Sequence, residues 1–460
     1  MLVSGSSGPL ADLLAENSVH DRFMRPVSVK DEALPIGFHS AVEGQPTAES
    51  MGEALLGSLL DRAHVMPPRL VGPLVAQEIH AVGGSEIAIF LQDYDQVHLQ
   101  PLKGEGLVGE RVLIDASLAG RAFATDTPVE EQVPDGSVRM YLPMLDGSDR
   151  IGVLSLSLPG VNDVDRRLAQ RLAGLVADLI VTKSGYTDTF AQTRTAQPMS
   201  VSAQLLRRAL PPLTMTNPDV ELAGALEPAY QVGGDSFDYA MNGHVLHFGV
   251  FDAMGHGLGA AAVATVVIAA YRHGRQIGLE LPALYAAMDQ VVAEAFPDRF
   301  ATAQIGRLDT ERGELTWINA GHPAPLWVRD GKVIGELTGT VTRPVGFGGA
   351  VAGPMSVRLE PGDRLLVFTD GVIEERLKGG EQFGEARLRQ ILEQIGAERL
   401  PTAETVRRLS HALKAARYGR TSDDASLLLV EYKGPPKDDE LATDIPETST
   451  GHFNRQRSAS

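Results

Sequence analysis

The sequence has no cysteine among its 460 residues. This absence excludes disulfides, thiolate-ligated zinc sites and every mechanism that uses a cysteine nucleophile. Long apolar runs are also lacking, because no stretch approaches the roughly 18 residues that indicate a membrane-spanning helix. The N-terminus shows no basic segment followed by an apolar core, so we expect no secretory signal. These absences together predict a soluble, cytoplasmic protein.

Basic side chains are scarce relative to acidic ones. Lysine and arginine number 41 against 59 aspartate and glutamate residues, which gives a formal net charge of −18. Such a charge argues against nucleic acid as a partner and offers no basic patch to an anionic membrane. The rest of the composition, 43% hydrophobic and 22% charged, is ordinary for a globular protein, and the length allows two or three domains.

The chain divides into segments of different character. Residues 1–48 mix glycine, serine, proline and charged residues, and we expect them to be mostly flexible. Residues 49–185 alternate between helical and strand-like patterns. Residues 186–212 combine a polar linker with a connecting helix that ends at a Pro-Pro pair. Residues 213–432 form the largest unit, and residues 433–460 have the composition of a disordered tail.

Within residues 49–185 the pattern predicts helices and strands in a definite order. Expected helices are Leu55–Val65, Leu70–Val82, Ser117–Ala124 and Asp165–Thr182, and expected strands are Glu86–Leu91, Val97–Pro101, Arg139–Leu145 and Ile151–Leu158. The last two strands are expected to form a hairpin. Beyond this unit, Val201–Leu210 is expected to be the connecting helix.

Two phrases of this unit, SLAGRAFATDTPV and RMYLPMLDGSDRIGVLSLSL, resemble a GAF domain. The resemblance implies a central antiparallel sheet with helices. It also implies either a small-molecule ligand or a purely structural role as a homodimerisation unit. Both alternatives stay open, because the phrases reflect shape and not chemistry.

Four aspartates stand where apolar, strand-like runs begin or end. They are Asp235, Asp252, Asp370 and Asp423. Carboxylates gathered at the ends of buried strands repel one another unless a cation joins them. Oxygen-only ligands favour magnesium or manganese.

The first two aspartates flank a predicted hairpin. Two strand-like runs lie between Asp235 and Asp252, and Asn242-Gly243 joins the runs. Asn-Gly is the strongest short hairpin signal, because a type I′ turn needs positive φ at both residues. A hairpin here would bring the two carboxylates together at its open end.

Six phrases occur in order in the C-terminal unit: PAYQVGGDSFD, FDAMGHGLGAA, NAGHPAPL, RPVGF, FTDGVIE and SDDASLLLV. They resemble the PPM-type serine/threonine phosphatases of the bacterial sporulation protein E class, over nearly all of residues 201–432. The resemblance implies an α-β-β-α sandwich, so the fold class expected for the whole chain is α+β. It also implies hydrolysis of phosphoserine or phosphothreonine by a water that two manganese or magnesium ions activate.

The resemblance assigns metal-binding roles to particular residues. The implied ligands are Asp235, Asp252, the backbone carbonyl of Ala253, Asp370 and Asp423. Asp252 would bridge the two ions. Taken singly, each aspartate would also fit a cap or a turn.

Several neighbouring residues have two interpretations each. Asp238 would hold a metal-bound water in the second shell or accept a structural hydrogen bond. Asp424 is expected to cap or point outward, and His256 is a candidate general acid for the leaving oxygen. Three further groups are noted: Gly255, Gly257 and Gly259, which either receive an anion or, as we favour, allow tight packing of a helix on the sheet; Asn319, Gly321 and His322, for which a shaping role is favoured over direct chemistry; and Arg343, the nearest candidate for a phosphate clamp.

The expected function is therefore that of a metal-dependent phosphoprotein phosphatase regulated by its GAF-like unit. Relatives of this architecture typically act on a STAS-domain anti-sigma-factor antagonist. Two alternatives stay open, namely a non-catalytic signalling scaffold and a phosphatase that acts on a small phosphoester. The four intact aspartates argue against the scaffold, since degenerate members generally lose them.

Overall fold

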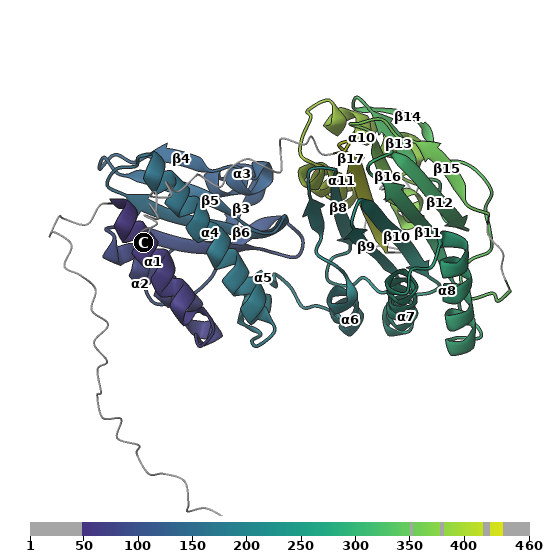
Figure 1. Ribbon diagram of the computed structural model, residues 1–460, viewed down its shortest axis with the longest axis horizontal. Coiled ribbons are helices and arrows are strands. Elements are labelled where there is room, and N and C mark those ends of the chain that lie inside the picture. The colour runs from purple at the N-terminus through teal and green to yellow at the C-terminus, as the bar shows by residue number, and fades with distance from the viewer. Residues whose placement is uncertain (1–47, 350–352, 378–380, 417–423, 436–460) are drawn as a thin grey trace, which may run out of the picture. The chain divides into compact units, whose positions relative to one another are not determined.

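The computed structural model describes residues 48–349, 353–377, 381–416 and 424–435 (Figure 1). Most of the predicted flexible segment 1–48 and of the predicted tail 433–460 lies outside these residues. Among the described residues, no helix combines the length and the apolar composition that a membrane crossing requires.

The N-terminal domain is built on a six-stranded antiparallel sheet of order β3-β2-β1-β6-β5-β4. Its strands are β1 (Ser85–Gln92), β2 (His98–Pro101), β3 (Val112–Leu113), β4 (Val129–Gln132), β5 (Val138–Asp146) and β6 (Asp149–Leu158). Its helices are α1 (Ala48–Ala63), α2 (Val71–Ala81), α3 (Leu118–Thr125) and α4 (Asp163–Ser184), with short 3-10 turns η1 (Pro68–Leu70) and η2 (Ile114–Ala116). Every helix and strand predicted for this unit is present, including the β5–β6 hairpin. Strands β3 and β4 were not predicted.

Strand β1 shows why this sheet is covered on both faces. Ile87, Ile89 and Leu91 pack with residues of α1, α2 and α4, whereas Ala88 and Phe90 pack with residues of α3. Successive side chains of a strand point to opposite faces, so an uninterrupted apolar strand requires a cover on each side.

Helix α3 begins where the sequence predicts. The Ser117 Oγ accepts a hydrogen bond from the backbone N–H of Gly120 at 2.9 Å, which satisfies one of the free donors at the helix start. In the linker, the predicted connecting helix is present as α6 (Val201–Ala209), and a short helix α5 (Thr189–Arg194) precedes it.

The C-terminal domain consists of two sheets. One has the order β15-β12-β11-β10-β9 and the other the order β14-β13-β16-β17-β8-β7. The strands are β7 (Thr214–Thr216), β8 (Val220–Glu227), β9 (Asp235–Asn242), β10 (Val245–Ala253), β11 (Ala301–Asp309), β12 (Glu314–Ala320), β13 (Leu326–Arg329), β14 (Lys332–Glu336), β15 (Met355–Arg358), β16 (Arg364–Phe368) and β17 (Ala425–Tyr432). The helices are α7 (Gly257–Gln276), α8 (Leu281–Ala295), α9 (Gly371–Glu374), α10 (Glu385–Gly396) and α11 (Thr402–Ala416).

The two sheets pack face to face with helices outside them (Figure 1). A Cβ on Gly224 of β8 would lie 2.3 Å from the Phe237 ring of β9, so the sheets meet closely at this point. Helices α6, α7 and α8 lie outside the sheet that contains β9, and helices α10 and α11 lie outside the sheet that contains β8. This is the α-β-β-α sandwich that the sequence predicts, and the α+β class of the chain is confirmed.

Candidate active site

The predicted hairpin is present and places two of the aspartates together. Strands β9 and β10 pair with Asp235 opposite Asp252 at the open end and with Asn242 opposite Val245 at the closed end. The expected type I′ turn is wrong, however. The turn residues are Gly243 and His244, and only Gly243 has positive φ, at +59°. Glycine at the first central position is typical of a type II′ turn, which suits the twist of a hairpin equally well.

The other sheet reaches the same place through a buried hydroxyl. The Thr369 Oγ1, just after β16, donates to a carboxylate oxygen of Asp235 at 2.6 Å and accepts from the backbone N–H of Ser426 at 2.8 Å. This bridge joins the ends of β9, β16 and β17, and Asp370 follows directly after it. Thr369 was missed at the sequence level. The available signal was a hydroxyl residue beside an aspartate in the phrase FTDG.

Close backbone contact fixes the segment after Asp370. A Cβ on Gly371 would lie 1.8 Å from the carbonyl oxygen of Asp424, so only glycine fits there. The Asp424 carboxylate in turn accepts hydrogen bonds from the backbone N–H groups of Gly233 and Gly234, both at 2.7 Å. The prediction that Asp424 caps is confirmed. Its carboxylate closes the turn that leads into Asp235.

The neighbouring carboxylates of Asp235 and Asp252 make this end of the sandwich favourable for a bound cation. Asp235 is 2% exposed, and burial, followed by the neighbouring Asp252 carboxylate, raises its pKa well above the ordinary value. The donors are oxygen atoms of carboxylates, which suit magnesium or manganese. The described residues contain no group of three His, Cys, Asp or Glu side chains arranged around one ion. Asp423, a predicted ligand, lies outside those residues.

The donor type and the acidic, buried setting fit a hard divalent ion. Asp370 stands at the N-cap position of α9, yet its side chain makes no cap hydrogen bond. Simple capping by its carboxylate therefore does not explain that residue. The metal-ligand roles of Asp235, Asp252, Asp370, Asp423 and the Ala253 carbonyl remain predictions.

Asp238 does not lie with the other aspartates. It is three positions after Asp235 on β9, so its side chain points to the opposite face of the strand. There it is 1% exposed and pairs with Arg272, whose Nε lies 2.9 Å from Oδ1, and with Arg275, both of α7. This placement favours the structural interpretation over the holding of a metal-bound water.

The NAGH loop is closed by its own asparagine. The Asn319 side chain accepts from the backbone N–H of His322 and donates to its carbonyl oxygen, each at 2.8 Å, and Gly321 has a φ of +75°. The His322 Nδ1 lies 2.8 Å from the Thr302 Oγ1, and burial lowers the pKa of His322 to about 3. A neutral, buried imidazole supports the shaping role. Thr302 stands opposite Asp252 in the sheet, so the hydrogen bond between His322 and Thr302 lies next to that aspartate.

The glycines after β10 bear out the tight packing that we favoured only in part. A Cβ added to Gly257 would meet nothing within 4 Å, and a Cβ on Gly255 or Gly259 would meet only the Arg299 guanidinium. The backbone at Gly257 is nevertheless closely packed, because a Cβ on Gly233 would lie 2.5 Å from the Gly257 nitrogen, and α7 packs on the sheet through its alanines further along. His256 is exposed at the helix start and makes no cap hydrogen bond. Its role as a general acid stays a prediction.

Comparison with known proteins matches this part of the chain. Residues 242–433 match the family model "Stage II sporulation protein E (SpoIIE)". These residues form a SpoIIE-type phosphatase domain. The matched range includes Asp252, Asp370 and Asp423, whereas Asp235 lies just before it.

Individual relatives share only part of their length with this chain. The phosphoserine phosphatase RsbP of Bacillus subtilis is 24% identical over 167 residues, which are 35% of this chain and 41% of the relative. Protein IcfG of Synechocystis is 33% identical over 94 residues, which are 20% of this chain and 15% of the relative. The chain thus spans less than half the length of these curated relatives.

Solved structures also match the chain in part. The RsbU and RsbW domains of a Mycobacterium tuberculosis protein are 28% identical, with 48% of this chain and 63% of that chain covered and a TM-score of 0.43. The SiaA-PP2C domain of Pseudomonas aeruginosa is 21% identical, with 50% and 93% covered and a TM-score of 0.43.

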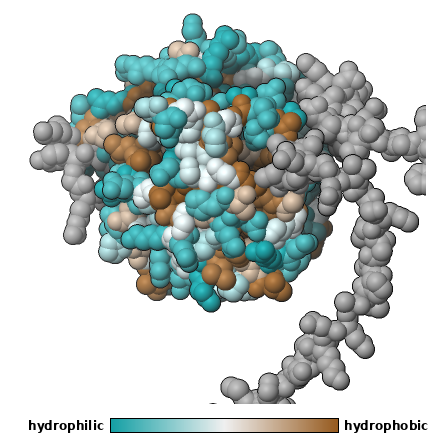
Figure 2. Space-filling model, turned by 90° about the vertical axis from the view of Figure 1, so that its left-hand side faces the viewer, coloured by the Kyte–Doolittle hydropathy of each residue, from teal (hydrophilic) through white to brown (hydrophobic). Residues whose placement is uncertain are grey.

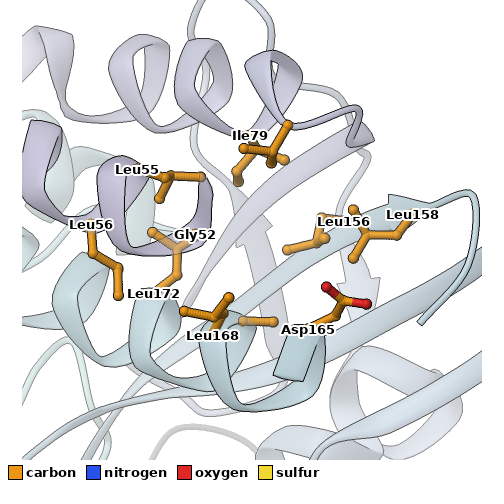
Figure 3. Close-up of a pocket in the computed structure, with 11 residues that line it drawn as sticks. Gly52, Leu55, Leu56, Ile79, Leu156, Leu158, Asp165, Leu168 and Leu172 are labelled. Carbon is orange, nitrogen blue, oxygen red and sulfur yellow. The ribbon is translucent and has the colours of Figure 1, made fainter. Parts of the chain in front are cut away.

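The N-terminal domain, which lies outside the SpoIIE-type match, contains an apolar cavity of about 230 Å³. Leucines of α1, β6 and α4 point into it together with Ile79 of α2 (Figure 3). The charged residue on its wall, Asp165, is already engaged, because its carboxylate accepts from the Asn162 backbone N–H at 2.9 Å. The cavity is therefore suited to an apolar group.

The same domain exposes apolar side chains on its helices. Leu60 and Val65, on α1 and just beyond it, are 55% and 82% exposed, and Val181 of α4 is 37% exposed. The space-filling view shows hydrophobic surface scattered among hydrophilic residues on this side (Figure 2). The cavity suits an apolar ligand, whereas apolar side chains scattered in this way are ordinary for a protein surface and do not by themselves indicate a dimer, so the two alternatives of the GAF resemblance both stay open.

Proposed function

We propose that this chain is a metal-dependent phosphatase that hydrolyses phosphoserine or phosphothreonine in a protein. The observation that carries the proposal is the register of the β9–β10 hairpin, which sets Asp235 opposite Asp252 at the end of the sandwich. Manganese or magnesium bound there would supply an activated hydrolytic nucleophile and neutralise charge on the phosphoryl group.

The surrounding residues would hold the carboxylates in position. Thr369 donates a hydrogen bond to one oxygen of Asp235 and so orients the carboxylate. Asp424 fixes the backbone turn before Asp235, and the close approach at Gly371 fixes the segment after Asp370. Rigid supports of this kind reduce the reorganisation that binding and catalysis require.

The substrate proposed is a phosphorylated STAS-domain anti-sigma-factor antagonist. The Bacillus subtilis relative is named a phosphoserine phosphatase, which supports a phosphorylated serine as the target. We further propose that residues 49–185 act as a GAF-type unit that regulates the phosphatase domain.

The test measures phosphate release from a phosphorylated antagonist with and without manganese. Asp235→Asn and Asp370→Asn are expected to abolish turnover and to reduce manganese binding measured by calorimetry. Asp330→Asn is the matched control, because Asp330 is also followed by glycine but sits in the β13–β14 turn with a φ of +50°, which asparagine tolerates. Turnover that survives both site variants, or that needs no divalent ion, would contradict the proposal. Binding of the phosphorylated protein without turnover would instead support a scaffold.

Regulation has a separate test. The two domains have separate hydrophobic cores, so each is expected to fold alone. Removal of residues 1–185 should change either the turnover rate or the oligomeric state in solution. If both stay the same, the regulatory role is wrong.

A further inference from the structure

The Arg299 side chain lies over the glycine segment that follows Asp252, a placement that no local sequence pattern predicts. Its guanidinium nitrogens lie 3.2 and 3.3 Å from the point where a Cβ of Gly259 would be, and 3.7 Å from that of Gly255. These glycines belong to the segment that follows Asp252. Three residues span at most about 11 Å, so the Asp252 and Gly255 backbones are close neighbours.

The backbone around Arg299 is tied down on several sides. The N–H of Met254 donates to the carbonyl of Phe300 at 2.9 Å, and Ala301 pairs with Ala253 in the sheet. Ala301 also exchanges backbone hydrogen bonds with Val345. The chain therefore presents Arg299 at a fixed position over the glycine segment.

The Arg299 guanidinium also has no partner among the described residues. The residue is exposed, and its side chain makes no hydrogen bond or ion pair within the residues that the structure describes. The two arginines of α7 differ, because Arg272 and Arg275 both pair with Asp238. An arginine fixed in place without an acidic partner is available for an anion of the substrate.

We propose that Arg299 binds the phosphoryl group of the substrate and aligns it with the carboxylate cluster. A guanidinium offers a planar fork that matches two phosphoryl oxygens. A side chain at 259 would crowd the guanidinium, whereas glycine there leaves it room to lie along the segment. This inference rests on the proposed phosphatase activity. It assigns to Arg299 the role of phosphate clamp, for which Arg343 was the candidate from the sequence.

The test compares Arg299→Ala, Arg299→Lys and Arg343→Ala in the full-length, manganese-loaded protein. Arg312→Ala is the control, because Arg312 is an exposed arginine in the β11–β12 turn, beyond the opposite end of β11 from Ala301. The measurements are kcat and KM on a phosphorylated protein and the affinity for inorganic phosphate by calorimetry. Arg299→Ala should lower kcat/KM and weaken phosphate binding, each by about 10- to 100-fold, the range of a charged hydrogen-bonded contact. Arg299→Lys should recover part of the loss, since it keeps the charge but not the fork.

The outcomes separate this inference from the proposed function. Phosphate binding that depends on Arg299 in a protein without turnover would support the site and contradict the phosphatase proposal. Turnover that Arg299→Ala leaves at the level of Arg312→Ala would overturn the inference alone. A loss confined to Arg343→Ala, or no phosphate binding by the unmodified protein, would also overturn it.

Discussion

Asp238 offers the sharpest test, because its two interpretations predict opposite results. Its side chain is 1% exposed and faces Arg275, which is 6% exposed, and Arg272, which is 35% exposed. Removing one partner of a buried ion pair costs about 3–5 kcal/mol, since the other charge is left uncompensated. Arg272 can turn toward water, and asparagine still accepts a hydrogen bond, so we expect about 3 kcal/mol for Asp238→Asn.

The chain contains two tryptophans, Trp317 and Trp327, and both lie in the phosphatase domain. Their fluorescence therefore reports the unfolding of this domain alone. A loss of about 3 kcal/mol should lower the midpoint of thermal unfolding by about 6–12 °C in a domain of this size. Manganese affinity should not change.

The control is Glu280→Gln, which removes the exposed ion pair with Arg307 and should shift the midpoint very little. If Asp238→Asn unfolds like this control yet loses manganese-dependent turnover, the structural assignment is wrong and Asp238 acts at the metal site.

Two other predictions concern the supports of the site. Gly371→Ala should abolish turnover and destabilise the domain, because its Cβ would lie 1.8 Å from the Asp424 carbonyl, whereas Gly335→Ala, which meets nothing within 4 Å, should be tolerated. Unchanged activity in Gly371→Ala would show that the two segments can separate. The pKa of His322 falls to about 3 in the folded protein, against an ordinary value of about 6.5 for an unfolded chain. The unfolded state therefore binds more protons between these values, and stability is lost as the pH falls below about 6.5. Urea unfolding at pH 7 and pH 5 should show a loss that is about 2 kcal/mol smaller in His322→Asn than in the unmodified protein. An equal loss in both would contradict the burial of a neutral imidazole.

The sequence predicts the elements of the fold well, because apolar periodicity reports which faces are covered. Strand β1 and the β9–β10 hairpin are both recognisable in this way. Strand β3 was missed since its two residues are too few to show a period. The hairpin turn was misplaced by one residue, because Asn-Gly satisfies a type I′ turn and Gly-His a type II′ turn with the same glycine.

The site is only partly readable from the sequence for a different reason. The aspartates stand in recognisable phrases, but their supports depend on contacts between distant segments. Thr369 reaches Asp235 across the two sheets, and Arg299 reaches Gly259 because β11 pairs with β10. Neither contact follows from local pattern, since sheet pairing and register decide both.

Asp235 and Asp238 show how one strand can supply two kinds of acidic site. Both carboxylates are buried, at 2% and 1% exposure, and burial raises the pKa of each. Asp238 receives two guanidinium groups from α7, so the protein itself supplies its counter-charge. Asp235 receives a hydroxyl from Thr369, faces the Asp252 carboxylate and has no ion pair with a lysine or arginine among the described residues. A buried carboxylate without a counter-charge is costly, so Asp235 must either take up a proton, which its raised pKa favours, or bind a cation. This difference between two neighbours on β9 is the physical basis for proposing a metal at Asp235 and not at Asp238.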